Sequence, residues 1–155
     1  MSEKTVMAAG TFDLLHLGHL HYLQEAKSLG DRLVVVVACD HTVRNRKHEP
    51  LMKEEVRREM VAALKPVDEA IIGGKGDPLD TVGELQPDII ALGYDQKHEE
   101  ETLNARLEKR GLEDIEVVRL EHYDYDLDGT RKIIRKIIDW YSMKIEVEKV
   151  EEQGR

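Results

Sequence analysis

Gly10-Thr11-Phe12-Asp13-Leu14-Leu15-His16-Leu17-Gly18-His19 is the most informative stretch of this sequence of 155 residues. It follows a short apolar run at residues 6–9, which is typical of a buried strand, and it opens a helical pattern that ends at Leu29. A loop that joins a strand to a helix N-terminus collects backbone N–H groups and the positive end of the helix dipole, and both attract phosphates. The stretch therefore predicts a phosphate site at the start of an α/β fold.

Apolar runs alternate with helical patterns outward from this loop. Residues 33–38 form a continuous, valine-rich run, which is the pattern of a strand buried on both faces. The alternation predicts a single-domain, Rossmann-like open parallel sheet with helices on both faces. The expected strands are 6–9, 33–38, 70–72, 88–92 and 116–120, and the expected helices are 18–29, 53–65, 79–85, 99–109 and 130–143.

We expect one domain over residues 1–143 and a tail at 144–155 that either extends the last helix or is disordered. Hydrophobic residues make up 41% of the chain and charged residues 35%, as in a folded globular protein. The single cysteine, Cys39, excludes an internal disulfide framework and a multi-cysteine zinc site. The N-terminus lacks the apolar core of a signal peptide, and the longest apolar run is about a third of a membrane span. The sequence thus predicts a cytoplasmic protein that does not enter a membrane.

The charge of the chain is strongly acidic, with a formal net charge of -9. Binding to nucleic acid draws its affinity mainly from phosphate neutralisation, so we expect no nucleic-acid partner. The segment HTVRNRKH, residues 41–48, is an exception because Arg44, Arg46 and Lys47 occur there without an acidic residue. Two interpretations stay open, a solvated loop and a basic loop that meets a phosphate-bearing substrate.

Ligands of open parallel sheets bind at the carboxyl ends of the strands, here the loops 10–18, 40–50, 93–98 and 123–130. In the first loop, His16 and His19 can donate hydrogen bonds to phosphate oxygens and carry charge. A zinc site is disfavoured because no cysteine stands near them and no H-E-x-x-H pattern occurs. The dinucleotide pattern G-x-G-x-x-G is also absent, and GGKGDP lacks the hydroxyl residue of a phosphate-binding Walker loop. The histidine loop therefore predicts phosphate binding without protein metal ligands.

Three segments carry a resemblance to one family. GTFDLLHLGH resembles the HxGH signature of the nucleotidyltransferase superfamily, in its cytidylyltransferase-like branch. Arg57 and Arg58, followed by LKPVDEAI, resemble the arginine-bearing helix and the "RYVD" element, with Lys65 in place of arginine. Residues 129–134, GTRKII, resemble the element in which a helix N-terminus receives the terminal phosphates of the nucleotide, although one hydroxyl residue of the family pattern is missing. All three occur in the family order over nearly the whole chain.

The loop GYDQKHEE, residues 93–100, is similar within this superfamily to the archaeal FAD synthases, and RREMVAALKPVD is close to the same group. This resemblance implies an FMN adenylyltransferase, which converts ATP and FMN to FAD and pyrophosphate. Cytidylyltransferases for glycerol phosphate usually carry "GDDW" in this loop. Two alternatives stay open: a CTP-dependent cytidylyltransferase for glycerol 3-phosphate or another small alcohol phosphate, and a non-catalytic nucleotide-binding module.

The resemblance also implies roles for individual residues. We expect a divalent cation, Mg2+, on the nucleotide phosphates, ATP and FMN as substrates, and a homodimer. The expected catalytic residues are His16, His19, Lys47 and Arg131. The expected nucleotide-binding residues are Gly10, Thr11, Phe12, Asp13, His16, Gly18, His19, Gly93, Tyr94, Asp95, Gly129 and Thr130. The expected substrate-binding residues are Arg44, Arg46, Lys47 and Arg57.

Overall fold

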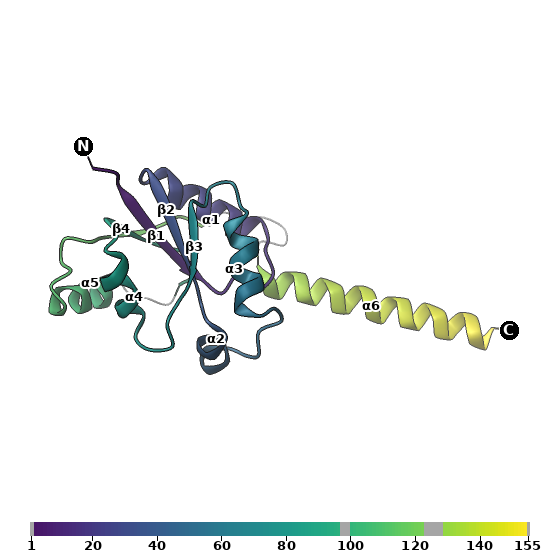
Figure 1. Cartoon of the computed structure of the whole chain (residues 1–155). Coiled ribbons are helices and arrows are strands. Elements are labelled where there is room, and N and C mark those ends of the chain that lie inside the picture. Colours follow the sequence, from purple (N-terminus) through teal and green to yellow (C-terminus); the bar gives the residue numbers. More distant parts are fainter. Residues whose placement is uncertain (1, 97–99, 123–128, 155) are drawn as a thin grey trace.

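A computed structural model describes residues 2–96, 100–122 and 129–154 of the chain. Five strands form one parallel sheet in the order β3-β2-β1-β4-β5 (Figure 1). The chain thus builds outward from β1 on one side and then crosses to its other side at β4. Such a reversal leaves a crevice at the carboxyl ends of the two central strands. The strands are β1 (Thr5–Gly10), β2 (Arg32–Val37), β3 (Glu69–Ile72), β4 (Ile89–Leu92) and β5 (Glu116–Arg119).

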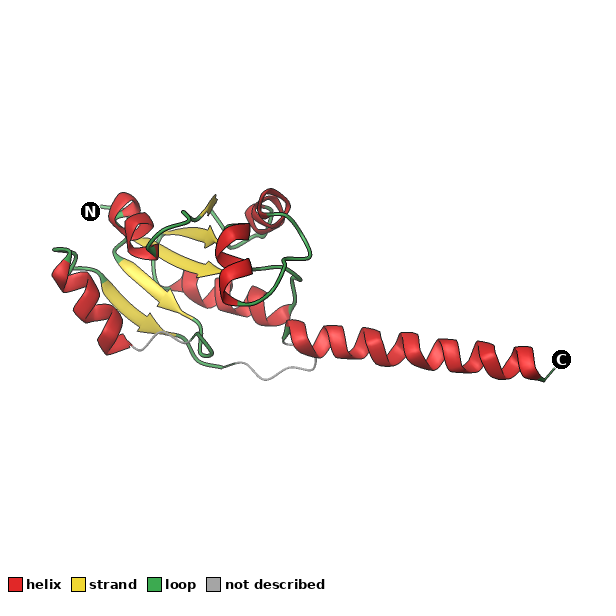
Figure 2. Cartoon of the chain, turned by 90° about the horizontal axis from the view of Figure 1, so that it is seen from below, coloured by secondary structure: helices red, strands yellow, loops and turns green. Residues whose placement is uncertain are grey.

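Helices cover both faces of this sheet (Figure 2). Successive side chains of a strand point to opposite faces, so Val6 and Ala8 of β1 enter one core and Met7 enters the other. The first core takes residues of α1 and α3, and the second takes residues of α4 and α5. The helices are α1 (Leu17–Ser28), α2 (Asp40–Arg46), α3 (Glu54–Ala62), α4 (Pro78–Leu85), α5 (Glu100–Lys109) and α6 (Thr130–Gln153). The expected α/β fold is therefore confirmed.

The sequence-based prediction was wrong for residues 40–46. Residues 40–46 were predicted as part of a loop, but they form the helix α2. Its seven residues give too short a window for a helical repeat, and Val43 is its one buried residue. Asp40 in the first turn suits the positive end of the helix dipole, and a buried arginine holds its carboxylate in place.

The last helix, α6, continues without a break through residues 144–153. Figures 1 and 2 show it leaving the globular part as a single rod. Of the expected loop 93–98, residues 97 and 98 lie outside the described residues, and so do residues 123–128 of the expected loop 123–130. Within the part of the chain that is described, no helix combines the length and hydropathy needed to cross a membrane.

Candidate active site

Two imidazoles stack at the N-terminus of α1. His16 is the N-cap, with extended backbone angles (φ -146°, ψ 176°), and its carbonyl accepts the backbone N–H of Leu20 at 3.2 Å. The ring of His19 lies one turn further on, with the two ring centroids 3.8 Å apart and the planes tilted by 25°. The Nδ1 atoms of both rings are buried. The HxGH spacing thus brings both histidines to the helix end at which backbone N–H groups are free to meet an anion.

The acid–base state of His19 follows from its surroundings. Burial, followed by the charges of His16 and Lys47, lowers the pKa of His19 from 6.5 to about 3. The imidazole is therefore neutral at pH 7 in the absence of ligand. A neutral imidazole still donates one N–H, and a bound polyphosphate would counter the effect of the neighbouring positive charges.

The backbone that presents these histidines is tightly wound. Phe12 is buried and adopts a left-handed φ of +54°, which is unusual for a residue with a side chain. Its ring lies against Gly10, where an added methyl group would stand only 2.9 Å from two ring carbons. The ring also packs on His19, with the centroids 5.1 Å apart. Gly10 and Phe12, both expected at the nucleotide site, therefore shape the loop that carries the histidines.

Asp13 ties the histidine loop to the segment that precedes α3. Its buried carboxylate accepts the backbone N–H of Leu51 at 2.8 Å and that of Met52 at 2.9 Å. Both oxygens are thus occupied by the chain itself. Asp13 was expected at the nucleotide, and in this structure it orders the loop, as a carboxylate that accepts two backbone donors does well.

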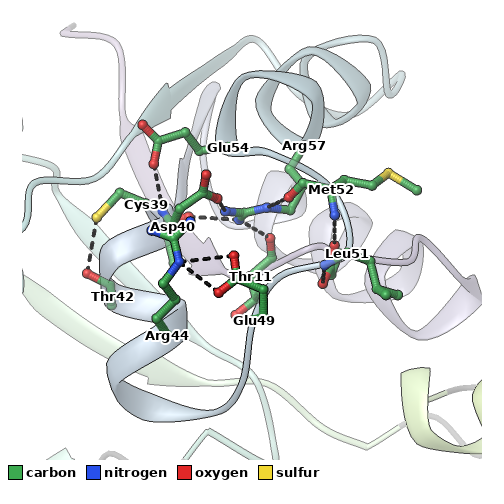
Figure 3. Close-up of polar contacts among 12 residues, drawn as sticks. Thr11, Cys39, Asp40, Thr42, Arg44, Glu49, Leu51, Met52, Glu54 and Arg57 are labelled. Atoms are coloured by element: carbon green, nitrogen blue, oxygen red, sulfur yellow. Dashed lines mark hydrogen bonds and ion pairs between the residues drawn. The ribbon is translucent and has the colours of Figure 1, made fainter.

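Arg57 of α3 is the largest fully buried side chain. Figure 3 shows its guanidinium at the centre of the polar contacts around α2 and α3. It donates to the carbonyls of Thr11 (2.8 Å), Ala38 (2.7 Å) and Met52 (2.9 Å) and pairs with Asp40 (2.7 Å).

These four bonds link the ends of β1 and β2 to the starts of α2 and α3. Arg57 was expected to bind substrate, but here its hydrogen bonds go to the chain, so the structure gives it the position of a clamp beneath the site. A planar guanidinium with several donors in fixed directions suits this role, and a lysine ammonium does not.

The basic segment, residues 41–48, begins one residue after Asp40, the ion-pair partner of Arg57. Glu54 accepts the backbone N–H of Asp40 at 2.6 Å, which fixes the first turn of α2 (Figure 3). Lys47 is the C-cap residue of this helix. Arg44 forms an ion pair with Glu49 at 2.9 Å, and this carboxylate raises the pKa of the guanidinium. The side chains of Arg46 and Lys47 are exposed. The positive charge of Lys47 contributes to the lowered pKa of His19.

The loop after β4 is held against the loop after β1. Gln96 donates to the carbonyl of Ala9 at 2.6 Å and accepts the backbone N–H of Gly93 at 3.2 Å. From the β5 side, Arg119 donates to the carbonyls of Gly93 and Gln96 at 2.9 and 3.1 Å. Tyr94 and Asp95 of this loop are exposed, and the ring of Tyr94 packs on that of His122 with the centroids 3.8 Å apart. The described part of the loop is thus fixed at its base by Gln96 and Arg119.

Tyr22 supports the floor between β1 and β4. Its hydroxyl donates to the carbonyl of Ala91 at 2.6 Å and accepts the backbone N–H of Ala9 at 3.3 Å. Burial raises the pKa of this phenol. The hydroxyl therefore stays protonated and acts as a fixed link between the two central strands at the crevice.

The third expected element stands at the start of α6. Gly129 is the N-cap, and Thr130 and Arg131 form the first turn, with the side chain of Arg131 exposed. The carbonyl of Gly129 accepts the backbone N–H of Ile133 at 3.2 Å, which starts the helix. The structure therefore joins the histidine loop to the 93–96 loop and to the segment before α3, and the role of residues 129–131 at the nucleotide stays a prediction.

Sequence reasoning missed Tyr22, Asp40, Gln96 and Arg119 as residues that position the site. Their partners are mostly backbone groups distant in sequence, so no local pattern marks them. The signal that could have found Gln96 was its place in the quoted loop GYDQ. Among the described residues, no cluster of three or more His, Cys, Asp or Glu side chains could hold a metal ion.

Comparison with known proteins agrees with this arrangement. The model of the cytidylyltransferase-like family matches residues 7–148, so the chain belongs to that family. Within it, the chain is 56% identical to the FAD synthase of Aciduliprofundum boonei over 135 residues, which cover 86% of this chain and 90% of that protein. It is 48% identical to the FAD synthase of Ferroglobus placidus over 143 residues, which cover 92% of this chain and 93% of the relative.

Solved structures show the same fold. A structure described as the lipopolysaccharide core biosynthesis protein from Thermoplasma volcanium superposes with a TM-score of 0.77 at 50% identity and covers 79% of this chain and 100% of its own. A protein of unknown function from Archaeoglobus fulgidus superposes with a TM-score of 0.64 at 21% identity, which supports the fold alone. The fold and the family rest on both kinds of comparison, and the curated relatives identify this chain as a nucleotidyltransferase.

Proposed function

We propose that this chain is an FMN adenylyltransferase that forms FAD and pyrophosphate from ATP and FMN. The observation that carries the proposal is the pair of stacked imidazoles at the N-terminus of α1, beside a loop pinned by Gln96, in a chain 56% identical to a curated FAD synthase. The stacked imidazoles support the binding and transfer of a phosphate-bearing nucleotide. The similarity to curated FAD synthases supports FMN as the acceptor.

The reaction needs little from the protein by way of proton transfer. An oxygen of the FMN phosphate attacks the α-phosphorus of ATP in line. A new P–O bond forms as the bond from the α-phosphorus to the bridging oxygen breaks, and the electron pair leaves with pyrophosphate. A phosphate monoester is already ionised at neutral pH, so no side-chain base is required. Catalysis therefore depends on holding the reactants in line and stabilising negative charge on the leaving group.

His16 and His19 contact the triphosphate in this proposal. The rings stand at the helix N-terminus, where backbone N–H groups also point at an anion. His19 is neutral before ATP binds, so it enters the reaction as a hydrogen-bond donor, and the phosphate charge raises its affinity for a proton as pyrophosphate forms. Hydrogen bonds that strengthen as charge develops accelerate the chemical step and do not merely tighten binding.

Lys47 bridges the α-phosphate and the phosphate of FMN, with Arg44 and Arg46 beside it. All three lie on or just after α2, the charge of Lys47 acts on His19, and the side chains of Arg46 and Lys47 are exposed. Arg44 must exchange Glu49 for a phosphate to take part, which an exposed ion pair permits at small cost in free energy. Arg131 and Thr130 hold the β- and γ-phosphates at the start of α6, and Tyr94 and Asp95 meet the adenine base or the flavin.

The divalent cation, Mg2+, enters with ATP as part of the substrate. The described residues offer no carboxylate cluster that would hold it alone, and Mg2+ binds readily to phosphate oxygens and water. The protein residues therefore bind and orient the MgATP complex.

A substrate grid tests the proposal. Purified protein with Mg2+ and either ATP or CTP is mixed with FMN or glycerol 3-phosphate, pyrophosphate is measured, and the flavins are separated by chromatography. We expect FAD and pyrophosphate only from ATP with FMN. Pyrophosphate only from CTP would replace this function with a cytidylyltransferase. Folded protein that binds ATP and releases pyrophosphate in no mixture would indicate a binding module.

A further inference from the structure

Two large apolar side chains are exposed beside the histidine loop. Leu17, the residue after His16, is 48% exposed, whereas every other residue from 11 to 20 is buried or half-buried. Leu51, three residues before α3, is 64% exposed. An apolar ligand that covers a leucine gains free energy by removing this surface from water, and small-molecule sites are lined mainly by apolar side chains. The two leucines therefore fit the apolar part of a ligand.

Both leucines lie at the carboxyl edge of the sheet and in the same helical layer. α1 and α3 pack into the same core, and each follows a parallel strand and so begins at the carboxyl end of the sheet. Leu17 is the first residue of α1, and the segment with Leu51 leads into α3. Asp13, four residues before Leu17, accepts the backbone N–H of Leu51 at 2.8 Å. This bond ties the segment with Leu51 to the loop that carries Leu17.

The backbone around Leu51 is held in a defined position. The next residue, Met52, donates its backbone N–H to Asp13 at 2.9 Å, and its carbonyl accepts a bond from Arg57 at 2.9 Å. Figure 3 shows the side chain of Leu51 directed away from the polar contacts around Arg57. The leucine belongs to neither core cluster, so its fixed backbone presents an apolar side chain to solvent. A contact that is already positioned costs less ordering entropy when a ligand binds.

The character of the chain changes along this segment from basic to apolar. Leu51 follows Lys47, the last cation of the basic segment, by four residues, and four residues of extended chain span at most about 14 Å. FMN has the same division, with a phosphate at one end of its ribityl chain and an apolar dimethylbenzene edge on the ring system at the other. Glycerol 3-phosphate has the phosphate but no group that could cover a leucine.

We infer that Leu17 and Leu51 form the part of the acceptor site that contacts the isoalloxazine ring of FMN. The inference rests on the proposed function, in which the basic segment receives the FMN phosphate. The leucines select a flavin phosphate over a small alcohol phosphate, because only the flavin covers their apolar surface. The residues that handle the phosphates serve either acceptor equally and make no such distinction.

Binding of FMN to the full chain tests this subsite without turnover. Flavin fluorescence gives the dissociation constant in the presence of Mg2+ and α,β-methylene-ATP, whose α–β link does not break. We expect Leu17→Ser and Leu51→Ser each to weaken FMN binding about tenfold, because each removes one apolar contact. Met60→Ser replaces a side chain that is also exposed but lies near the far end of α3, so this matched control should bind FMN as the wild type does. Urea unfolding should show equal stability for all three variants.

Riboflavin separates the contribution of the ring from that of the phosphate. It carries the isoalloxazine ring without the phosphate, so it should compete with FMN for the wild-type chain. Its affinity should fall about tenfold in both leucine variants. Inorganic phosphate, which lacks the ring, should compete equally well in the wild type and in the variants.

Unchanged FMN affinity in both leucine variants of a chain whose wild type forms FAD would overturn the inference and leave the proposed function standing. Equal weakening of FMN and α,β-methylene-ATP would also overturn it, because a disturbed histidine loop predicts that result. A wild-type chain that neither forms FAD nor binds FMN would overturn the proposed function and this inference together.

Discussion

Replacement of His16 or His19 should lower the rate of FAD formation without changing the stability of the fold. Both rings are half-buried at the N-terminus of α1 and belong to neither core cluster, so an asparagine of smaller size should leave the fold intact. For His16→Asn and His19→Asn we expect FAD formation to fall by about 10² to 10³, the usual loss for one preorganised donor in the transition state. Steady-state rates at saturating MgATP measure this, with Lys109→Ala at the exposed end of α5 as the control. Rates within twofold of wild type for both variants would refute a catalytic role.

The lowered pKa of His19 also predicts how stability depends on pH. The unfolded chain binds a proton on this residue below pH 6.5, whereas the folded chain does so only near pH 3. Stability from His19 is therefore complete above pH 6.5 and declines as the pH falls toward 3, by at most about 1.4 kcal/mol per pH unit.

Urea unfolding at pH 7 and pH 5 measures this dependence. We expect the wild type to lose up to about 2 kcal/mol more between these values than His19→Asn does. Equal losses in the two proteins would show that His19 titrates normally in the folded chain.

At the scale of the elements, Arg57 decides how the ends of two strands and the starts of two helices fit together. Arg57→Lys keeps the charge but removes the fork that reaches Thr11, Ala38 and Asp40 together. Because buried acceptors then lose their donors, we expect a loss of about 2–4 kcal/mol in unfolding free energy and a raised KM for ATP. Chemical denaturation and initial rates measure both. Arg58→Lys, at the next and partly exposed position, is the control and should change stability by less than about 0.5 kcal/mol.

The basic segment makes a different prediction, since its residues contribute to substrate contact and not to the core. Lys47→Ala should lower kcat for FAD formation by about 10² with unfolding free energy unchanged, because its ammonium follows α2 and lies near His19. Lys109→Ala, at the exposed end of α5, should have no effect. If the two alanine variants have equal rates, the segment at 41–48 is a solvated surface and the proposal for Lys47 is wrong.

For the whole molecule, the sequence predicted the parts of the fold that repeat and missed the parts that depend on single contacts. The valine run predicted a central strand because burial on both faces leaves a continuous apolar run, and the helical repeats predicted the flanking helices because burial on one face leaves a period of 3.6 residues. The helix α2 was missed because it is seven residues long and is held by Arg57 and Glu54, which follow it in the chain. The candidate site likewise contains residues that a local sequence pattern predicts and residues that only the folded structure shows. His16 and His19 stand in a recognisable spacing, but the clamp by Arg57 and the link by Gln96 join backbone groups that no local pattern connects.

The boundary at residue 143 remains a prediction about the whole chain, and a truncated chain tests it. Every buried residue of the two cores lies before α6, so a chain of residues 1–143 should keep the globular fold. We expect cooperative thermal unfolding with a midpoint within about 3 °C of the full chain, because no residue of α6 is buried in either core. Far-UV circular dichroism should lose helical signal in proportion to residues 144–153 alone. Loss of cooperative unfolding would show instead that the second half of α6 belongs to the folded unit, and the domain would then extend to the end of the helix.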